Sequence, residues 1–123
     1  MTKLDDLLQE VRLQLGSDLL STDVVGTDGM SIASVSSAPN FDASAAAARF
    51  AMVMKLAGNV AGKINQGKVD DTLTTTGKAY ILTRFLGDGT YYWMVAVTKE
   101  AVLGMVRMLM NEYVDQIWKA IPR

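Results

Sequence analysis

The sequence predicts one α/β domain, of the α+β kind, with helices and strands in the order α-β-β-α-β-β-β-α. Three observations predict it: helical periodicity in three segments, β-branched residues in the segments between them, and glycine-containing turns. The 123 residues suit a single domain, and no repeat or long linker divides them, so we expect residues 1–123 to form one unit. Strands joined by short turns predict one five-stranded antiparallel sheet packed against helices.

The first segment has helical periodicity over residues 4–15, with Thr2 placed to cap the helix and Gly16 placed to end it. Two segments rich in β-branched and small residues follow at 19–25 and 30–35. An Asp-Gly pair between them suits a tight turn. We therefore expect a helix followed by two antiparallel strands.

A long helix is expected next, beginning at Asp42 or Ser44, running to about Gln66 and closed by Gly67. Plotted at about 100° per residue, it has three faces. The face expected to lie on the sheet comprises Phe50, Val53, Ala57, Ala61 and Ile64. A strip of small residues, which suits either a second helix or a thin core, comprises Ala47, Ala51, Gly58 and Gly62. The third face mixes cations with apolar side chains: Arg49, Met52, Lys55, Leu56, Asn59 and Lys63.

This mixed face is a candidate partner-binding surface. Charged helix faces are usually just solvated. Exposed apolar groups rimmed by charge are instead typical of protein contacts, and Met52 and Leu56 interleave with the cations in this way. We give the two interpretations equal weight and take all six residues as candidates.

Three further strands are expected at residues 69–76, 79–86 and 90–97, separated by glycine-containing turns. Thr98 is placed to cap a last helix over residues 99–121. The core-facing stripe of this helix comprises Val102, Val106, Leu109, Tyr113 and Ile117.

One strand carries a candidate dimer contact: Thr72, Leu73, Thr74, Thr75 and Thr76. The segment contains no proline and no lysine, so at a sheet edge it lacks the usual protection against edge-to-edge pairing. A second copy pairing there, with the small-residue strip of the long helix meeting its counterpart, predicts a two-fold homodimer. The alternative is an inner strand that is already paired on both sides.

Composition excludes several classes of function. Twelve basic and thirteen acidic residues give a net charge of -1 and are spread along the chain, which does not favour nucleic acid. The absence of cysteine and histidine removes thiol nucleophiles and the commonest metal ligands, so we expect no catalytic residue, metal or cofactor. No apolar run is long enough to predict a membrane span, and the acidic start is unlike a secretory signal, so we expect a cytoplasmic protein.

Two motifs resemble nucleotide-binding loops, but neither is complete. Residues 58–63 look like a phosphate-binding loop, but they are one residue short and lie within a predicted helix. Ile64 stands where the magnesium-binding hydroxyl belongs. Residues 87–89 lack the third glycine of a dinucleotide-binding loop and lie between two strands, where a hairpin turn is sufficient to account for them. We therefore expect that the chain does not itself bind GTP.

Two phrases of the sequence stand out: Val24-Val25-Gly26-Thr27-Asp28-Gly29-Met30-Ser31-Ile32-Ala33-Ser34, and Tyr92-Trp93-Met94-Val95-Ala96-Val97 with Leu103-Gly104-Met105-Val106-Arg107. They resemble the Roadblock family, also called the dynein light chain Roadblock family. The resemblance covers nearly the whole chain. These phrases are packing and turn patterns, so they bear on the fold more than on chemistry. Val102 stands where members of this family often carry asparagine.

The resemblance implies a profilin-like fold, a homodimer joined through the third strand and second helix, and association with Ras-like small GTPases. The most similar bacterial members include a GTPase-activating protein of a cell-polarity system, which repositions the catalytic groups of its GTPase. We therefore expect a regulatory module that modulates GTP hydrolysis by a partner. Among the arginines, Arg49 and Arg107 are the candidates for stabilising charge on the partner's phosphates. The alternatives are a scaffold subunit that ignores the nucleotide and a small-molecule sensor.

Overall fold

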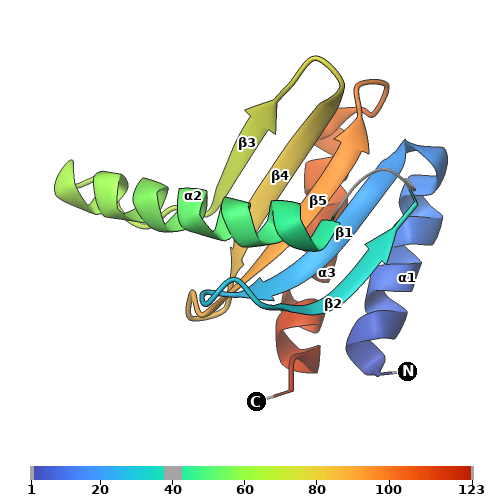
Figure 1. Cartoon of the computed structure of the whole chain (residues 1–123), viewed down its shortest axis with the longest axis horizontal. Helices are drawn as coiled ribbons and strands as arrows, with labels where there is room; N and C mark the ends of the chain where they lie inside the picture. The colour runs from blue at the N-terminus through green and yellow to red at the C-terminus, as the bar shows by residue number, and fades with distance from the viewer. Residues whose placement is uncertain (1, 38–42, 123) are drawn as a thin grey trace.

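The computed structural model describes residues 2–37 and 43–122. The elements in chain order are α1 (Lys3–Leu15), a 3-10 turn (Gly16–Asp18), β1 (Leu19–Gly26), β2 (Ser31–Ser36), α2 (Ala43–Lys63), β3 (Asp71–Thr75), β4 (Ala79–Leu86), β5 (Tyr91–Thr98) and α3 (Leu103–Ala120). The strands form one antiparallel sheet in the order β2-β1-β5-β4-β3. Helices α1 and α3 cover one face and α2 crosses the other (Figure 1). The predicted fold class and element order are confirmed.

The bulk of the core lies between the sheet and the helices α1 and α3. Leu8, Trp93 and Ile117 are fully buried there. The Trp93 indole Nε1 donates to Thr22 Oγ1 at 2.8 Å, and Thr22 Oγ1 donates to the carbonyl oxygen of Met94 at 3.0 Å. Because the one polar group of the indole is paired, its large apolar area is buried without an unsatisfied donor.

The core beneath α2 is thinner. Ala47 and Ala51 of the helix meet small strand residues such as Ala96, and Met54 is the one long helix side chain that is fully buried among the described residues of α2. Alanine removes little apolar area from water, so this layer contributes less hydrophobic free energy than the opposite one. Helix α2 is therefore held to the sheet less strongly than α1 and α3.

The two predicted ends of α1 are confirmed. Asp5 N donates to Thr2 Oγ1 at 3.2 Å, while Thr2 N donates to Asp5 Oδ2 at 3.1 Å, so the two residues form a reciprocal capping box. Gly16 ends the helix with φ 59°, a left-handed conformation that glycine adopts without steric cost.

The predicted ends of α2 are partly wrong. Asp42, one of the two expected caps, lies outside the described residues, and Ser44 lies inside the helix, which begins at Ala43. At the other end Asn65, rather than Gly67, closes the helix, with φ 56°. Its N–H donates to Gly62 O at 3.2 Å and Gln66 N donates to Ala61 O at 3.0 Å, the two bonds of a Schellman motif.

The predicted start of α3 is wrong as well. Thr98 ends β5, and a turn in which Ala101 N donates to Thr98 O at 3.2 Å delays the helix. The N-cap is Val102, which has no side-chain oxygen to offer. Val102 is 61% exposed and so does not join the core stripe, because it lies outside the helical turn. The other four predicted stripe residues are buried: Val106, Leu109, Tyr113 and Ile117.

The β4–β5 turn depends on Gly87. Its φ of 53° is left-handed, and a Cβ at this position would lie 2.0 Å from the Trp118 ring of α3. The absence of a side chain therefore lets the turn lie directly against the last helix. This contact fixes α3 at the end of the sheet.

The uncapped start of α3 predicts a stabilising substitution. Val102 has extended backbone angles (φ -88°, ψ 108°), the conformation in which an asparagine side chain accepts a hydrogen bond from the first turn. We expect Val102→Asn to raise the free energy of unfolding by about 1 kcal/mol. Urea unfolding measures it, with Val102→Ala as the control that offers no acceptor. Equal stability of the two variants would contradict the capping role.

Candidate interaction surface

Helix α2 is rotated relative to the sequence-based expectation. Ala47 and Ala51, expected in the strip that meets a second helix, are each 2% exposed because they pack on the sheet of their own chain. Val53 and Ile64, expected on the sheet, are 45% and 60% exposed. Small side chains let the helix backbone approach the strands closely, and this close approach decides which face is buried.

The outward side of α2 therefore carries an exposed apolar stripe that runs from the middle of the helix to the turn just after its last residue. We call it the outer α2 stripe; it comprises Met52, Val53, Leu56, Val60 and Ile64, all exposed. Exposed apolar residues are common singly, but a contiguous row is typical of a contact surface. Sequence reasoning found only Met52 and Leu56 of this stripe.

All six residues of the predicted partner-binding face are exposed: Arg49, Met52, Lys55, Leu56, Asn59 and Lys63. They lie on the outward side of α2, so the helix brings them together on one surface. Of the small-residue strip, Gly62 is exposed and Gly58 is partly exposed.

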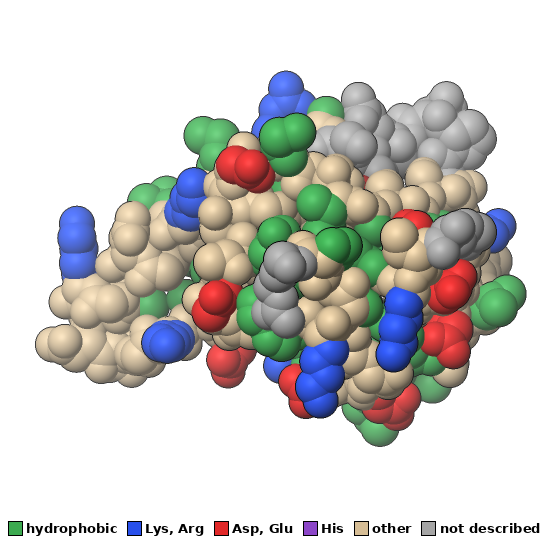
Figure 2. Space-filling view, turned by 90° about the horizontal axis from the view of Figure 1, so that it is seen from below, with side chains coloured by type: hydrophobic (Ala, Val, Ile, Leu, Met, Phe, Trp, Pro, Cys, Tyr) green, Lys and Arg blue, Asp and Glu red, His purple; other side chains and the backbone are tan. Residues whose placement is uncertain are grey.

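The second half of α2 projects past the sheet. In Figure 1 the helix crosses the strands and continues beyond the edge strand β3, and Figure 2 shows the same end standing out from the body of the molecule. The last turn of the helix and the turn that closes it carry Val60 and Ile64, which are 50% and 60% exposed. An apolar helix segment without support from its own sheet offers area that a partner can bury.

The expected edge position of the third strand is confirmed, and the inner-strand alternative is wrong. β3 is the last strand of the sheet and pairs with β4 alone. Its outer backbone groups therefore face away from the sheet over residues 71–75. Thr76 lies just beyond the strand, where its Oγ1 accepts Ala79 N at 2.9 Å and Lys78 N at 3.1 Å and shapes the β3–β4 turn.

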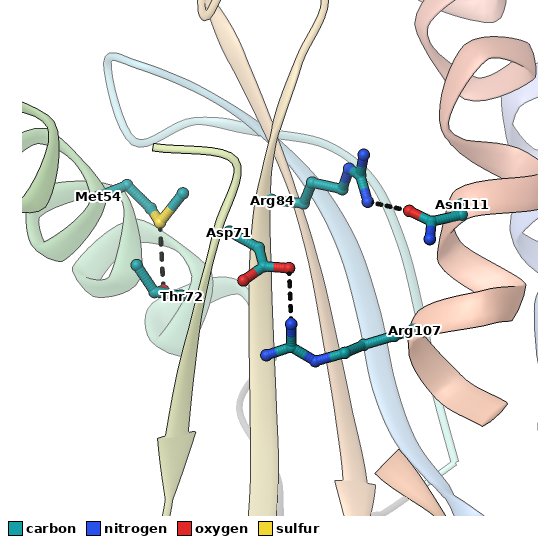
Figure 3. A network of polar contacts seen from close by, with 6 residues as sticks. All are labelled: Met54, Asp71, Thr72, Arg84, Arg107 and Asn111. Atoms are coloured by element: carbon teal, nitrogen blue, oxygen red, sulfur yellow. Dashed lines mark hydrogen bonds and ion pairs between the residues drawn. The ribbon is translucent and has the colours of Figure 1, made fainter. Parts of the chain in front are cut away.

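Polar contacts hold this edge strand from both faces of the sheet (Figure 3). On one face, Arg107 of α3 pairs with Asp71 at 3.2 Å. On the other, Thr72 Oγ1 donates to Met54 Sδ of α2 at 3.2 Å. Arg107 is thus bound on the face opposite α2 and cannot act beside Arg49, so the two arginines do not form one site.

A buried carboxylate that sequence reasoning missed lies beneath α2. Asp23 of β1 has no exposed surface and accepts hydrogen bonds from Ser31 Oγ at 2.6 Å and Ser34 Oγ at 3.1 Å. Burial raises the pKa of Asp23, and the two serine hydroxyls oppose that rise in part. The sequence feature that could have predicted a buried carboxylate is the place of Asp23 in an apolar strand, with serines on the other strand of the hairpin.

A groove of about 830 Å³ lies under the projecting end of α2. Glycines of α2 and of the β4–β5 turn line it, together with side chains of both charges, including Lys68, Asp70 and Arg84. A small-molecule site needs an apolar pocket with a few converging polar groups, whereas this groove is open and its lining mixes glycines with side chains of both charges. Within residues 2–37 and 43–122, no three acidic side chains gather as a metal site, and no helix is long and apolar enough to cross a membrane.

Solved structures share this fold over nearly the whole chain. MglB of Myxococcus xanthus matches with a TM-score of 0.85 and 18% identity, covering 97% of this chain and 94% of that one. A Roadblock/LC7 domain from Streptomyces avermitilis matches with a TM-score of 0.80 and 18% identity over 92% of each chain. Profilin II of Acanthamoeba castellanii matches with a TM-score of 0.65 and 13% identity, covering 95% of this chain and 98% of that one.

At these identities the likeness establishes the fold. No protein-family model matches the sequence, and no curated protein matches it either. The profilin-like Roadblock fold that the sequence resemblance implied is therefore confirmed by three-dimensional similarity.

The buried carboxylate of Asp23 predicts a pH-dependent stability. Because its pKa is raised in the folded chain, the folded state loses stability as pH rises from the ordinary aspartate pKa through the raised one. Asp23→Asn removes this loss and retains partners for both serines. We expect the variant to gain stability over the natural chain as pH rises through that interval, in urea unfolding from about pH 3 to about pH 8.

Asp115→Asn, at an exposed position on α3, is the matched control and should show no such gain. A stability difference between Asp23→Asn and the natural chain that stays constant with pH would contradict the assignment.

Proposed function

We propose that this chain, which has the Roadblock fold, forms a homodimer that binds a Ras-like small GTPase and modulates its GTP hydrolysis. The proposal assigns it no catalytic residue of its own. The observation that carries the proposal is the combination of an open β3 edge with the apolar, projecting half of α2 beside it. The Roadblock resemblance supports the identity of the partner.

The dimer begins at β3. Two copies pair antiparallel through this edge about a two-fold axis, which continues the sheet from one chain into the next. The strand suits such pairing because Thr72, Leu73, Thr74 and Thr75 carry no charge, and β3 lacks proline. Asp71 at its start is already neutralised by Arg107, so the edge meets its partner without an unpaired carboxylate.

The projecting half of α2 fits the same dimer. When the sheet continues past β3, the part of α2 that leaves its own strands lies over the strands of the partner. Gly58 and Gly62 continue the sheet-facing side of the helix beyond Ala47 and Ala51. Gly58 lies over Phe85 of its own β4, whereas a Cβ on Gly62 would meet no atom of its own chain within 4 Å, so Gly62 faces the partner's sheet with little obstruction. The small-residue strip is thus shared between the two copies.

The two helices then lie side by side, and each has an apolar flank to offer. At about 100° per residue, Val53, Val60 and Ile64 fall within a narrow arc on one side of α2. Lys55 and Asn59 fall on the other side. We assign the apolar flank to the second copy and the mixed flank, with Leu56 at the ridge, to the GTPase.

Regulation of a GTPase in this way requires no chemistry from the regulator. A regulator that binds one nucleotide state better than the other shifts the partner toward that state, whatever residues perform hydrolysis. The chain contains no histidine or cysteine, and Arg107 is engaged by Asp71. The role that the Roadblock resemblance implies, positioning the GTPase's own catalytic groups, is compatible with such a chain.

The dimer is tested at the apolar flank. Val60→Glu places a charge in the contact of both copies, and desolvating an unpaired charge is costly. We expect the dimer to dissociate to monomers at about 10 μM, measured by sedimentation equilibrium with circular dichroism to check folding. Met105→Glu, at an exposed residue of α3, is the control and should remain dimeric. Unchanged mass for Val60→Glu would contradict the assigned flank.

GTPase binding is tested by substituting Leu56, the apolar residue between the two flanks of α2. We expect titration calorimetry with a Ras-like GTPase encoded in the same genome to give at least about fivefold tighter binding in the GTP-analogue state than in the GDP state. Leu56→Ala should weaken the tighter binding by about tenfold, because it removes a central apolar contact. Leu13→Ala, at another exposed leucine, on α1 across the sheet, should leave it unchanged.

The outcomes separate the alternatives. Equal affinity for both nucleotide states would favour the nucleotide-insensitive scaffold over the regulator, because regulation requires differential binding. Absence of binding in either state would contradict the GTPase assignment for that partner.

A further inference from the structure

Charge is segregated on this chain in a way that its net value hides. Between Asp42 and Asp70 the sequence contains four cations and no acidic residue: Arg49, Lys55, Lys63 and Lys68. The remaining residues hold eight basic and thirteen acidic side chains. The positive charge is thus concentrated on α2 and the loop that follows it. On its projecting end Figure 2 shows basic side chains and no acidic ones.

These four cations are exposed, and no ion pair joins them to another residue of the described ranges 2–37 and 43–122. Within the described residues the one ion pair is Arg107 with Asp71, and no carboxylate lies within ion-pair distance of the four cations of α2 and its loop. In the β1–β2 turn, Asp28 accepts the N–H of Met30 at its Oδ1 at 3.0 Å, and the carboxylate of Asp23 is held by Ser31 and Ser34. Unpaired like charges on one element raise the local potential and attract an oppositely charged surface.

We infer that the outer face of α2 docks on an acidic face of the GTPase, with Arg49, Lys55 and Lys63 opposite carboxylates. This inference rests on the proposed function, and it names the chemistry of the partner's surface. From Arg49 to Lys63 the helix rises about 21 Å, which suits the footprint of a standard protein contact. Met52 and Leu56 lie between the cations and supply the apolar centre.

A membrane surface is the other acidic partner that a basic, apolar helix can suit, but the arrangement of α2 favours a protein. A helix that lies in a membrane interface keeps its cations beside a continuous apolar arc. On α2, Arg49 and Lys63 fall within about 20° of Leu56, at the centre of the outward side. Inserting that side would carry both charges toward the acyl chains, whereas carboxylates on a protein can meet them in place.

Association kinetics test this inference directly. Stopped-flow measurements follow the dimer binding the GTP-analogue form of the GTPase from about 50 mM to about 500 mM NaCl. We expect the association rate constant to fall at least about tenfold over this range, with a much smaller change in dissociation, because charges at a contact act mainly on encounter. Lys55→Glu with Lys63→Glu should lower the low-salt association rate at least about tenfold.

The control carries the same change of net charge elsewhere. Lys3→Glu with Lys119→Glu reverses two exposed lysines on α1 and α3, across the sheet, and should retain most of the association rate and its salt dependence. A milder pair, Lys55→Gln with Lys63→Gln, shows an intermediate rate if charge rather than local packing is responsible. Circular dichroism and sedimentation confirm that each variant folds and dimerises.

The results of these measurements either support or overturn the inference of an acidic partner surface. A salt-independent association rate, or equal loss in both reversal pairs, overturns the acidic-face inference and leaves GTPase binding intact. Binding to vesicles of anionic phospholipid, abolished by the Lys55 and Lys63 reversal, with no salt-dependent GTPase association, overturns it in favour of a membrane. Failure to bind the GTPase at any salt concentration overturns the proposed function together with the inference.

Discussion

The close approach of α2 to the sheet is the constraint on which the proposed contacts depend. Ala47 and Ala51 let the helix backbone lie near the strands, and Met54 fills the space that remains. This packing fixes the rotation of the helix, so the outer α2 stripe points away from the core. A larger residue in place of either alanine would lift or turn the helix and would change which residues a partner meets.

The edge strand β3 connects the packing of α2 to the proposed dimer. β3 lies at the end of the sheet, with α3 tied to it through Arg107 and Asp71 and α2 tied to it through Met54 and Thr72. Both layers of the domain are thereby held in register with the edge through which a second copy would pair. The projecting end of α2 would complete its packing on that second copy, and its cations would remain available for another partner.

Periodicity and turn chemistry were sufficient to predict the element order and an antiparallel sheet, because helices and hairpins depend on local sequence. The edge position of β3 was predicted only as the favoured of two alternatives, because it depends on the long-range pairing of β1 with β5. The rotation of α2 was not predictable in this way. The helix is apolar on more than one side, and periodicity cannot tell a thin alanine face from the valine and isoleucine face that usually marks a core. The predicted start of α3 was wrong for a similar reason. Thr98 has a side chain that suits a helix cap, but its pairing with Ala79 of β4 extends β5 to this residue.

Pairing through β3 is the central claim, and the absence of cysteine makes it directly measurable. Single-cysteine variants at Thr72, Leu73, Thr74 and Thr75, oxidised in solution, form an intermolecular disulfide only where Cα atoms approach within about 7 Å. Antiparallel pairing through β3 predicts a covalent dimer from at least one of these positions and none from Ser34→Cys on the opposite edge. Covalent dimer from Ser34→Cys alone, with all four β3 variants remaining monomeric, would contradict it.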